Sequence, residues 1–142
     1  MKILATLAAA TLLCVSAALP QTPVPVQHKV VLQMNVDGET SWNQVLGNAR
    51  NIQTAFGEKN VRIEIVTYGK GILLMLKTNT AFEAQLKKAV ESGIVIAVCQ
   101  NSMRGRKVKS EDLFPFATEV DSGAAELVRK QEAGFAYLRA GE

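Results

Sequence analysis

Short apolar runs alternate with amphipathic segments along most of this chain, and that alternation determines the fold class. The run Val30–Val36 is rich in β-branched residues and has the length of a buried strand. Between Trp42 and Phe56 the apolar residues recur at steps of three and four, as on one face of a helix, and Gly57 ends the segment. A strand followed by a helix and then another strand favours parallel pairing.

The same pattern continues to the C-terminus. Further strands are predicted at 61–67, at 94–98, after Pro115 within 113–120, and at 135–138. Helices are predicted at 72–76, at 81–92, after Cys99, and after the capping sequence 121–123. We therefore predict an α/β fold with three α/β/α layers and a mostly parallel five-stranded sheet that carries helices on both faces.

The N-terminus has the pattern of a secretory signal peptide over residues 1–18. A basic start precedes the apolar run 3–18, and Ser16 and Ala18 are small residues suited to a cleavage site. We expect a periplasmic or secreted protein that is free of the membrane once the signal is removed. Two alternatives stay open: an uncleaved anchor, since the run is near the minimum length for spanning, and lipid attachment at Cys14.

Residues 19–28 contain Pro20, Pro23 and Pro25, and we predict an extended tether there, followed by one domain over 29–142. The formal net charge is only +3 at pH 7, which is too small to favour binding of nucleic acid.

Removal of the signal would take Cys14 with it and leave Cys99 as the one thiol of the mature chain. No internal disulfide is then expected, and one cysteine with His28 cannot build a zinc site. A single histidine in the proline-rich end also disfavours serine or cysteine hydrolase chemistry. We expect neither a metal nor a cofactor.

Cys99 follows the apolar run 94–98 and precedes a predicted helix, so it is expected at the carboxyl edge of a parallel sheet. Ligands of open α/β folds bind at that edge, and a helix N-terminus favours the thiolate. The alternative is a structural cysteine, because cysteine is among the most buried residue types.

Other candidate residues follow the strands that should end at this edge. Arg104 lies a little over one helical turn after Cys99, so its guanidinium could approach an anion held at the thiol, such as a persulfide, sulfite or thiosulfate. The alternative is that the basic stretch 104–109 is a solvated loop. Asn35, Gly69 and Gly71 are further candidates for ligand binding, with turn and capping roles as the alternative.

Residues 29–141 resemble the DsrE/DsrF-like family, particularly its small exported branch. The segment 98–105 carries most of this likeness, and Met34-Asn35-Val36, 46–51 and 125–137 add to it. It implies a three-layer α/β/α domain that often forms trimers or hexamers. In the best understood members it implies a cysteine that accepts sulfane sulfur as a persulfide and passes it on, and this cysteine matches Cys99.

These observations predict a periplasmic sulfur carrier or sulfurtransferase that works through Cys99 with donor and acceptor proteins, and they leave open whether the protein is an enzyme. The alternative is a non-enzymatic oligomeric binding or scaffold protein in which Cys99 is buried. A nucleotide or flavin site at the sheet edge is a third hypothesis.

Overall fold

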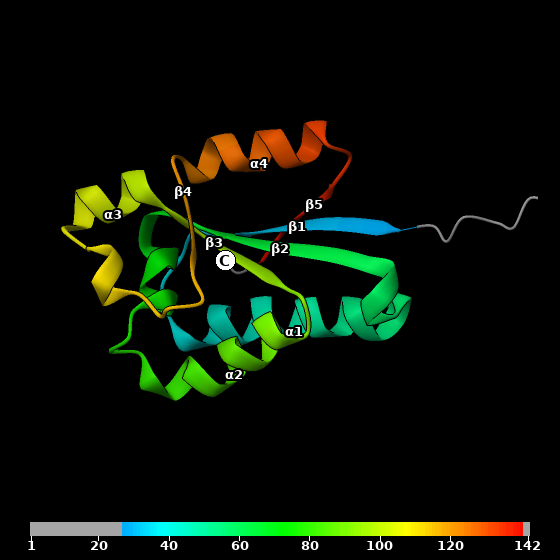
Figure 1. Cartoon of the computed structure of the whole chain (residues 1–142), viewed down its shortest axis with the longest axis horizontal. Helices are drawn as coiled ribbons and strands as arrows, with labels where there is room; N and C mark the ends of the chain where they lie inside the picture. The colour runs from blue at the N-terminus through cyan, green and yellow to red at the C-terminus, as the bar shows by residue number, and fades with distance from the viewer. Residues whose placement is uncertain (1–26, 141–142) are drawn as a thin grey trace, which may run out of the picture.

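The computed structural model describes residues 27–140. The predicted signal peptide and most of the predicted tether lie outside these residues. The described chain forms one five-stranded sheet in the order β4-β3-β2-β1-β5, with every neighbouring pair parallel (Figure 1). The strands are β1 His28–Met34, β2 Val61–Thr67, β3 Val95–Cys99, β4 Thr118–Val120 and β5 Ala136–Arg139.

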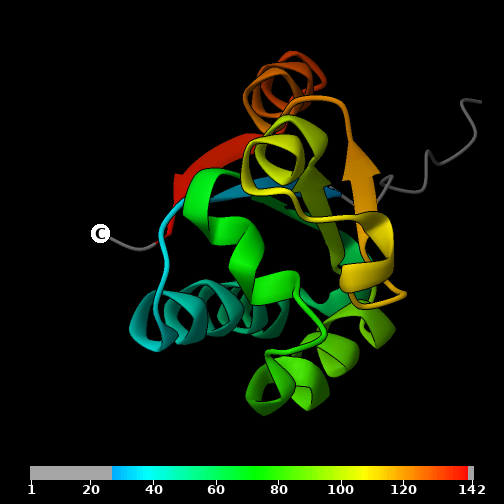
Figure 2. The same ribbon diagram turned by 90° about the vertical axis from the view of Figure 1, so that its left-hand side faces the viewer.

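Helices cover both faces of this sheet. The helices α1 Glu39–Phe56 and α2 Thr80–Glu91 pack on one face, and α4 Gly123–Glu132 covers the other, while α3 Gln100–Arg106 continues directly from β3. Figure 2 shows the three layers end on. The predicted α/β/α architecture is therefore confirmed, with a sheet that is parallel throughout.

The two faces of the sheet bury unequal cores because successive strand residues point to opposite sides. Along β1, Leu32 contributes to a large core under α1 and α2, whereas Val31 belongs to a small core under α4. The small core contains Val66, Ala97 and Leu127 in addition. The α4 layer is thus thinly packed, and polar groups lie close to the sheet on this side.

Most predicted elements agree with the structure to within a few residues. The segment 72–76 belongs to a 3₁₀ helix, η2 Gly69–Met75, and two further short 3₁₀ helices are η1 Glu58–Asn60 and η3 Ser110–Asp112. The first strand begins at His28, one residue before the expected domain boundary. Within residues 27–140, no helix combines the length and the apolar character needed to cross a membrane.

Candidate functional site

Cys99 is the last residue of β3 and the N-cap of α3, so it lies at the carboxyl edge of the sheet as the sequence predicts. Its side chain is buried, with 4% of its surface exposed. The neighbouring strand β4 leads into α4, whose first residue is Gly123. Two helices therefore begin beside the same sulfur atom, and their first N–H groups are directed toward it.

Ser102 supplies hydrogen bonds to the sulfur from one turn into α3. Its main-chain N–H donates to Cys99 Sγ at 3.4 Å. Its Oγ accepts a bond from the N–H of Gly69 at 2.8 Å, which leaves the hydroxyl proton free to be donated to the thiol sulfur. The hydroxyl thus connects the loop after β2 to the sulfur at the end of β3.

These bonds favour the thiolate over the thiol. Burial by itself would raise the pKa of Cys99, but hydrogen bonds from the Ser102 hydroxyl and from the N–H groups of Gly123, Ser102 and Asn101 outweigh it, and the pKa lies below its ordinary value. A thiolate needs no nearby cation here, because main-chain dipoles solvate the charge.

Gly123 allows α4 to approach this closely. A Cβ at position 123 would lie 2.8 Å from Cβ of Tyr68, which is closer than real side chains allow, and 3.2 Å from Cβ of Cys99, which is a tight contact. Any larger residue would push the N-terminus of α4 away from the sulfur. The sequence predicted a cap at residues 121–123, and Ser122 does cap α4 by accepting a bond from the N–H of Ala125 at 3.4 Å.

A chain of polar side chains extends from Tyr68 across the α4 face of the sheet. Gln33 donates to the Tyr68 hydroxyl and accepts a bond from the Tyr137 hydroxyl, so the three groups link the residue after β2 to β1 and β5. Burial, with a smaller contribution from Tyr137, raises the pKa of Tyr68. The Tyr68 hydroxyl is therefore neutral and keeps its own proton for donation.

The two candidate glycines have different roles. Gly69 has a φ of 56° and donates to Ser102, so it holds the turn that orients the hydroxyl toward the site. Gly71 is buried, and a Cβ there would lie 2.1 Å from the main-chain oxygen of Met34. The structure thus places Gly69 at the sulfur site, whereas Gly71 permits close packing against the end of β1.

Asn35 follows β1 at the same edge, two strands away from Cys99. Its Oδ1 is buried and has no hydrogen-bond partner among the described residues. Its main-chain oxygen lies 3.3 Å from the position of a Cβ on Gly69. Asn35 is therefore packed beside the Gly69 turn, and a role in ligand binding stays a prediction.

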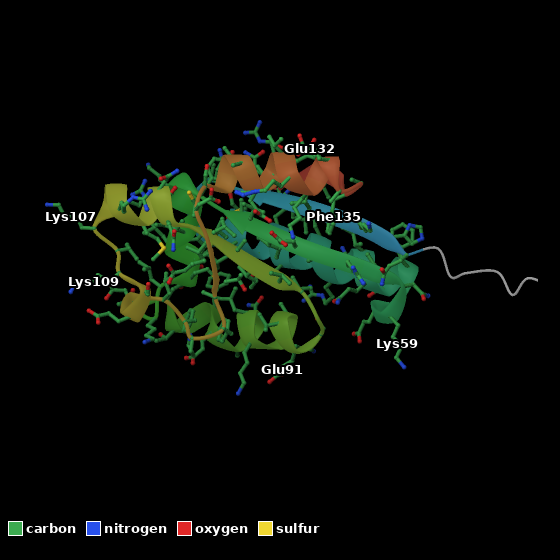
Figure 3. All side chains as sticks on the ribbon, turned by 45° about the horizontal axis from the view of Figure 1, so that its top comes forward. Lys59, Glu91, Lys107, Lys109, Glu132 and Phe135 are labelled. Atoms are coloured by element: carbon green, nitrogen blue, oxygen red, sulfur yellow. The ribbon has the colours of Figure 1, made fainter. Side chains whose placement is uncertain are left out.

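The basic stretch lies on and after α3. Arg104 is exposed and donates to Oδ1 of Asn101, so its guanidinium lies along the helix, and its predicted role in anion binding stays a prediction. Arg106 Nε donates to the main-chain oxygen of Gly69 at 2.9 Å and ties α3 to the turn. Lys107 and Lys109 lie at the outer end of this region (Figure 3).

Sequence reasoning missed Tyr68, Gln33 and Ser102 as parts of this site. Tyr68 stands before a glycine after β2, as many loop residues do, so its own sequence neighbourhood indicates no role. Its spatial neighbours Gly123 and Gln33 are far from it along the chain. Ser102 lies three residues after Cys99, which is the spacing of a helix N-cap contact, so the sequence alone could have predicted the bond between the Ser102 N–H and Cys99 Sγ.

The fold and the site together define a three-layer α/β/α protein with a hydrogen-bonded thiol at the carboxyl edge of its sheet. The model of the DsrE/DsrF-like family matches residues 41–140, and the chain belongs to this family, which is associated with sulfur relay. A comparison with curated proteins gives no match.

Solved structures of similar fold cover most of the chain. A protein of unknown function from Methanobacterium thermoautotrophicum, MTH1491, is 26% identical with a TM-score of 0.75, and the match covers 80% of this chain and 99% of that one. The ychN protein from E. coli is 15% identical with a TM-score of 0.65, covering 80% and 98%. A conserved protein of unknown function from Bacteroides thetaiotaomicron, BT1422, is 19% identical with a TM-score of 0.64, covering 78% and 93%.

Proposed function

We propose that this protein carries sulfur as a persulfide on Cys99 and transfers it to an acceptor thiol. The observation that supports this most directly is the set of hydrogen bonds that lowers the pKa of Cys99 despite its burial. A structural cysteine in an apolar core has no need of such donors. The thiolate is also the form that attacks a sulfane donor.

The proposed chemistry takes two steps. With thiosulfate as donor, the Cys99 thiolate attacks the outer sulfur, the S–S bond of thiosulfate breaks, and sulfite leaves with the bonding electron pair. The product is a Cys99 persulfide anion. An acceptor thiolate then attacks the terminal sulfur, takes it as its own persulfide, and restores the Cys99 thiolate. Neither step requires a metal or an external oxidant.

The N–H groups around Cys99 would support both steps. They stabilise negative charge on Sγ in the free thiolate and again when Cys99 is the leaving group of the second step. We propose the periplasm or the exterior of the cell as the location, on the strength of the predicted signal peptide.

We further propose a homo-oligomer, a trimer or hexamer. Val128 on α4 and Tyr137 and Leu138 on β5 are 53%, 43% and 40% exposed. Tyr137 lies on the α4 face of the sheet and Leu138 on the opposite face, so this edge strand and α4 expose apolar side chains that a neighbouring copy could cover.

Mass spectrometry tests the proposed function. Protein incubated with thiosulfate or polysulfide should gain about 32 Da per sulfur atom. The adduct should form in a Cys14→Ser background, in which Cys99 is the one thiol, and should be absent when Cys99→Ser is added, so the single variant is the matched control. An adduct that persists when Cys99→Ser is added, or no adduct on either protein, would contradict the proposal.

One observation favours the second candidate, an oligomeric binding or scaffold protein. Cys99 is 4% exposed, which limits the access of any donor larger than a small anion. Alkylation by iodoacetamide separates the two candidates. A thiol that reacts in the folded protein supports sulfur transfer, whereas a thiol that reacts only in denaturant supports the scaffold.

A further inference from the structure

A cavity of about 230 Å³ opens at the end of the molecule opposite to Cys99, between α1 and α2. Its apolar lining consists of Leu46 from α1, Ala89 from α2 and Ile94 before β3. The length of β3 puts it roughly 17 Å from the thiol. This cavity is therefore separate from the proposed sulfur site.

One wall of the cavity is held in place by a reciprocal pair of hydrogen bonds. Gln53 is buried, and its Nε2 donates to the main-chain oxygen of Ser92 at 2.8 Å. The Ser92 hydroxyl shares its one proton between the main-chain oxygen of Ala89 at 2.7 Å and Gln53 Oε1 at 3.1 Å. These bonds join the end of α2 to α1, so the wall is formed before any ligand binds.

Two cations line the same cavity. Arg50 comes from α1 and Lys88 from α2, and neither forms an ion pair with a carboxylate in the described chain. Glu58 is the acidic residue of the lining, so the cavity has a net positive charge. A negatively charged group between Arg50 and Lys88 would find two cationic side chains that no carboxylate within residues 27–140 pairs with.

We propose that this cavity binds a small amphiphilic anion, in which a short apolar chain packs on Leu46, Ala89 and Ile94 while a carboxylate lies between Arg50 and Lys88. The volume equals roughly eight water molecules at liquid density, which limits the ligand to a short chain. Hexanoate has about that many non-hydrogen atoms. The site would work independently of Cys99.

Titration with hexanoate, followed by amide chemical shifts of the purified protein, tests the proposal. Shifts should be confined to the ends of α1 and α2, and hexylammonium should produce none of them. Arg50→Gln and Lys88→Gln should each weaken binding about tenfold, the effect of losing one charge-assisted hydrogen bond. Lys87→Gln, a neighbouring lysine outside the lining, should leave binding unchanged and is the matched control.

A second variant tests the apolar part of the cavity. Ala89→Leu should fill the floor and abolish the shifts, while the two charge variants are on exposed side chains and keep the fold. Absence of shifts at about 10 mM hexanoate would overturn the proposal. So would equal binding of hexanoate and hexylammonium, or unchanged binding in both Arg50→Gln and Lys88→Gln.

Discussion

Removal of the Ser102 hydroxyl is the perturbation that bears most closely on the state of Cys99. In Ser102→Ala the sulfur loses the bond from the hydroxyl but keeps the N–H donors of Ser102 and Gly123. A hydrogen bond to a charged group contributes about 1.5 to 3 kcal/mol, and 1.36 kcal/mol corresponds to about one pKa unit. We therefore expect the pKa of Cys99 to rise by about one to two units.

The same variant should also lower stability. The N–H of Gly69 loses its acceptor at 2.8 Å, and because this donor is only half-buried we expect a cost of about 1 kcal/mol, at the lower end of the range for unpaired donors. Ser102→Thr keeps the hydroxyl and serves as the control, with a pKa close to that of the parent protein.

The assay is the rate of alkylation of Cys99 as a function of pH, in a Cys14→Ser background so that one thiol reports. The midpoint of the profile gives the pKa, whatever the absolute rate through the buried site. An unchanged midpoint in Ser102→Ala, or an equal rise in Ser102→Thr, would refute the conclusion that the hydroxyl stabilises the thiolate.

Three further predictions concern the rest of the fold. Gly71→Ala should lower the free energy of unfolding in chemical denaturation by about 3 kcal/mol or more, because the new Cβ would clash with main-chain atoms of Met34 and Asn35. Gly47→Ala, at a helix position with open space around it, should raise the free energy of unfolding by about 0.5 to 1 kcal/mol. Equal effects of the two substitutions would contradict this account of the packing. Burial raises the pKa of Glu64 despite its ion pair with Lys130. The stability that comes from the protonated Glu64 carboxyl is therefore fully present below pH 4.5 and is lost as the pH rises through the raised pKa. Glu64→Gln should therefore gain stability relative to the parent between pH 4 and 7, and a constant difference across that range would contradict this sign. Arg104→Gln should slow persulfide formation from thiosulfate about tenfold because the anion loses the attraction of the guanidinium, and an unchanged rate would contradict a role of Arg104 in anion binding.

The three α/β/α layers can be predicted from the sequence because local patterns determine which segments are helices and which are strands. Spacing of three and four from Trp42 to Phe56 predicts α1, and the apolar run before Cys99 predicts β3. A helix is predicted at 72–76, although a run of five apolar residues suits either period, and the structure has a 3₁₀ helix there. Strand order could not be predicted from the pattern, because β2 lies at the centre of the sheet although it carries Arg62 and Glu64.

The candidate site was predictable only in its local part. Cys99 and Ser102 are three residues apart, so helix capping brings them together without tertiary information. Gly123 and Tyr68 contact the site only after the strands pair, and nothing in their own neighbourhoods indicates it. The expectation of cations near the thiolate came from proximity along the chain, whereas the structure solvates the sulfur with N–H groups and turns Arg104 along its helix.

Transfer of sulfur out of Cys99 is the central claim, and cyanide tests it directly. Cyanide attacks the outer sulfur of a persulfide, releases thiocyanate and restores the thiolate. Protein that carries Cys14→Ser, loaded with thiosulfate and then freed of excess reagent, should release about one thiocyanate per chain, and it should release none when Cys99→Ser is added. No thiocyanate from the loaded protein, or an equal yield when Cys99→Ser is added, would contradict the account.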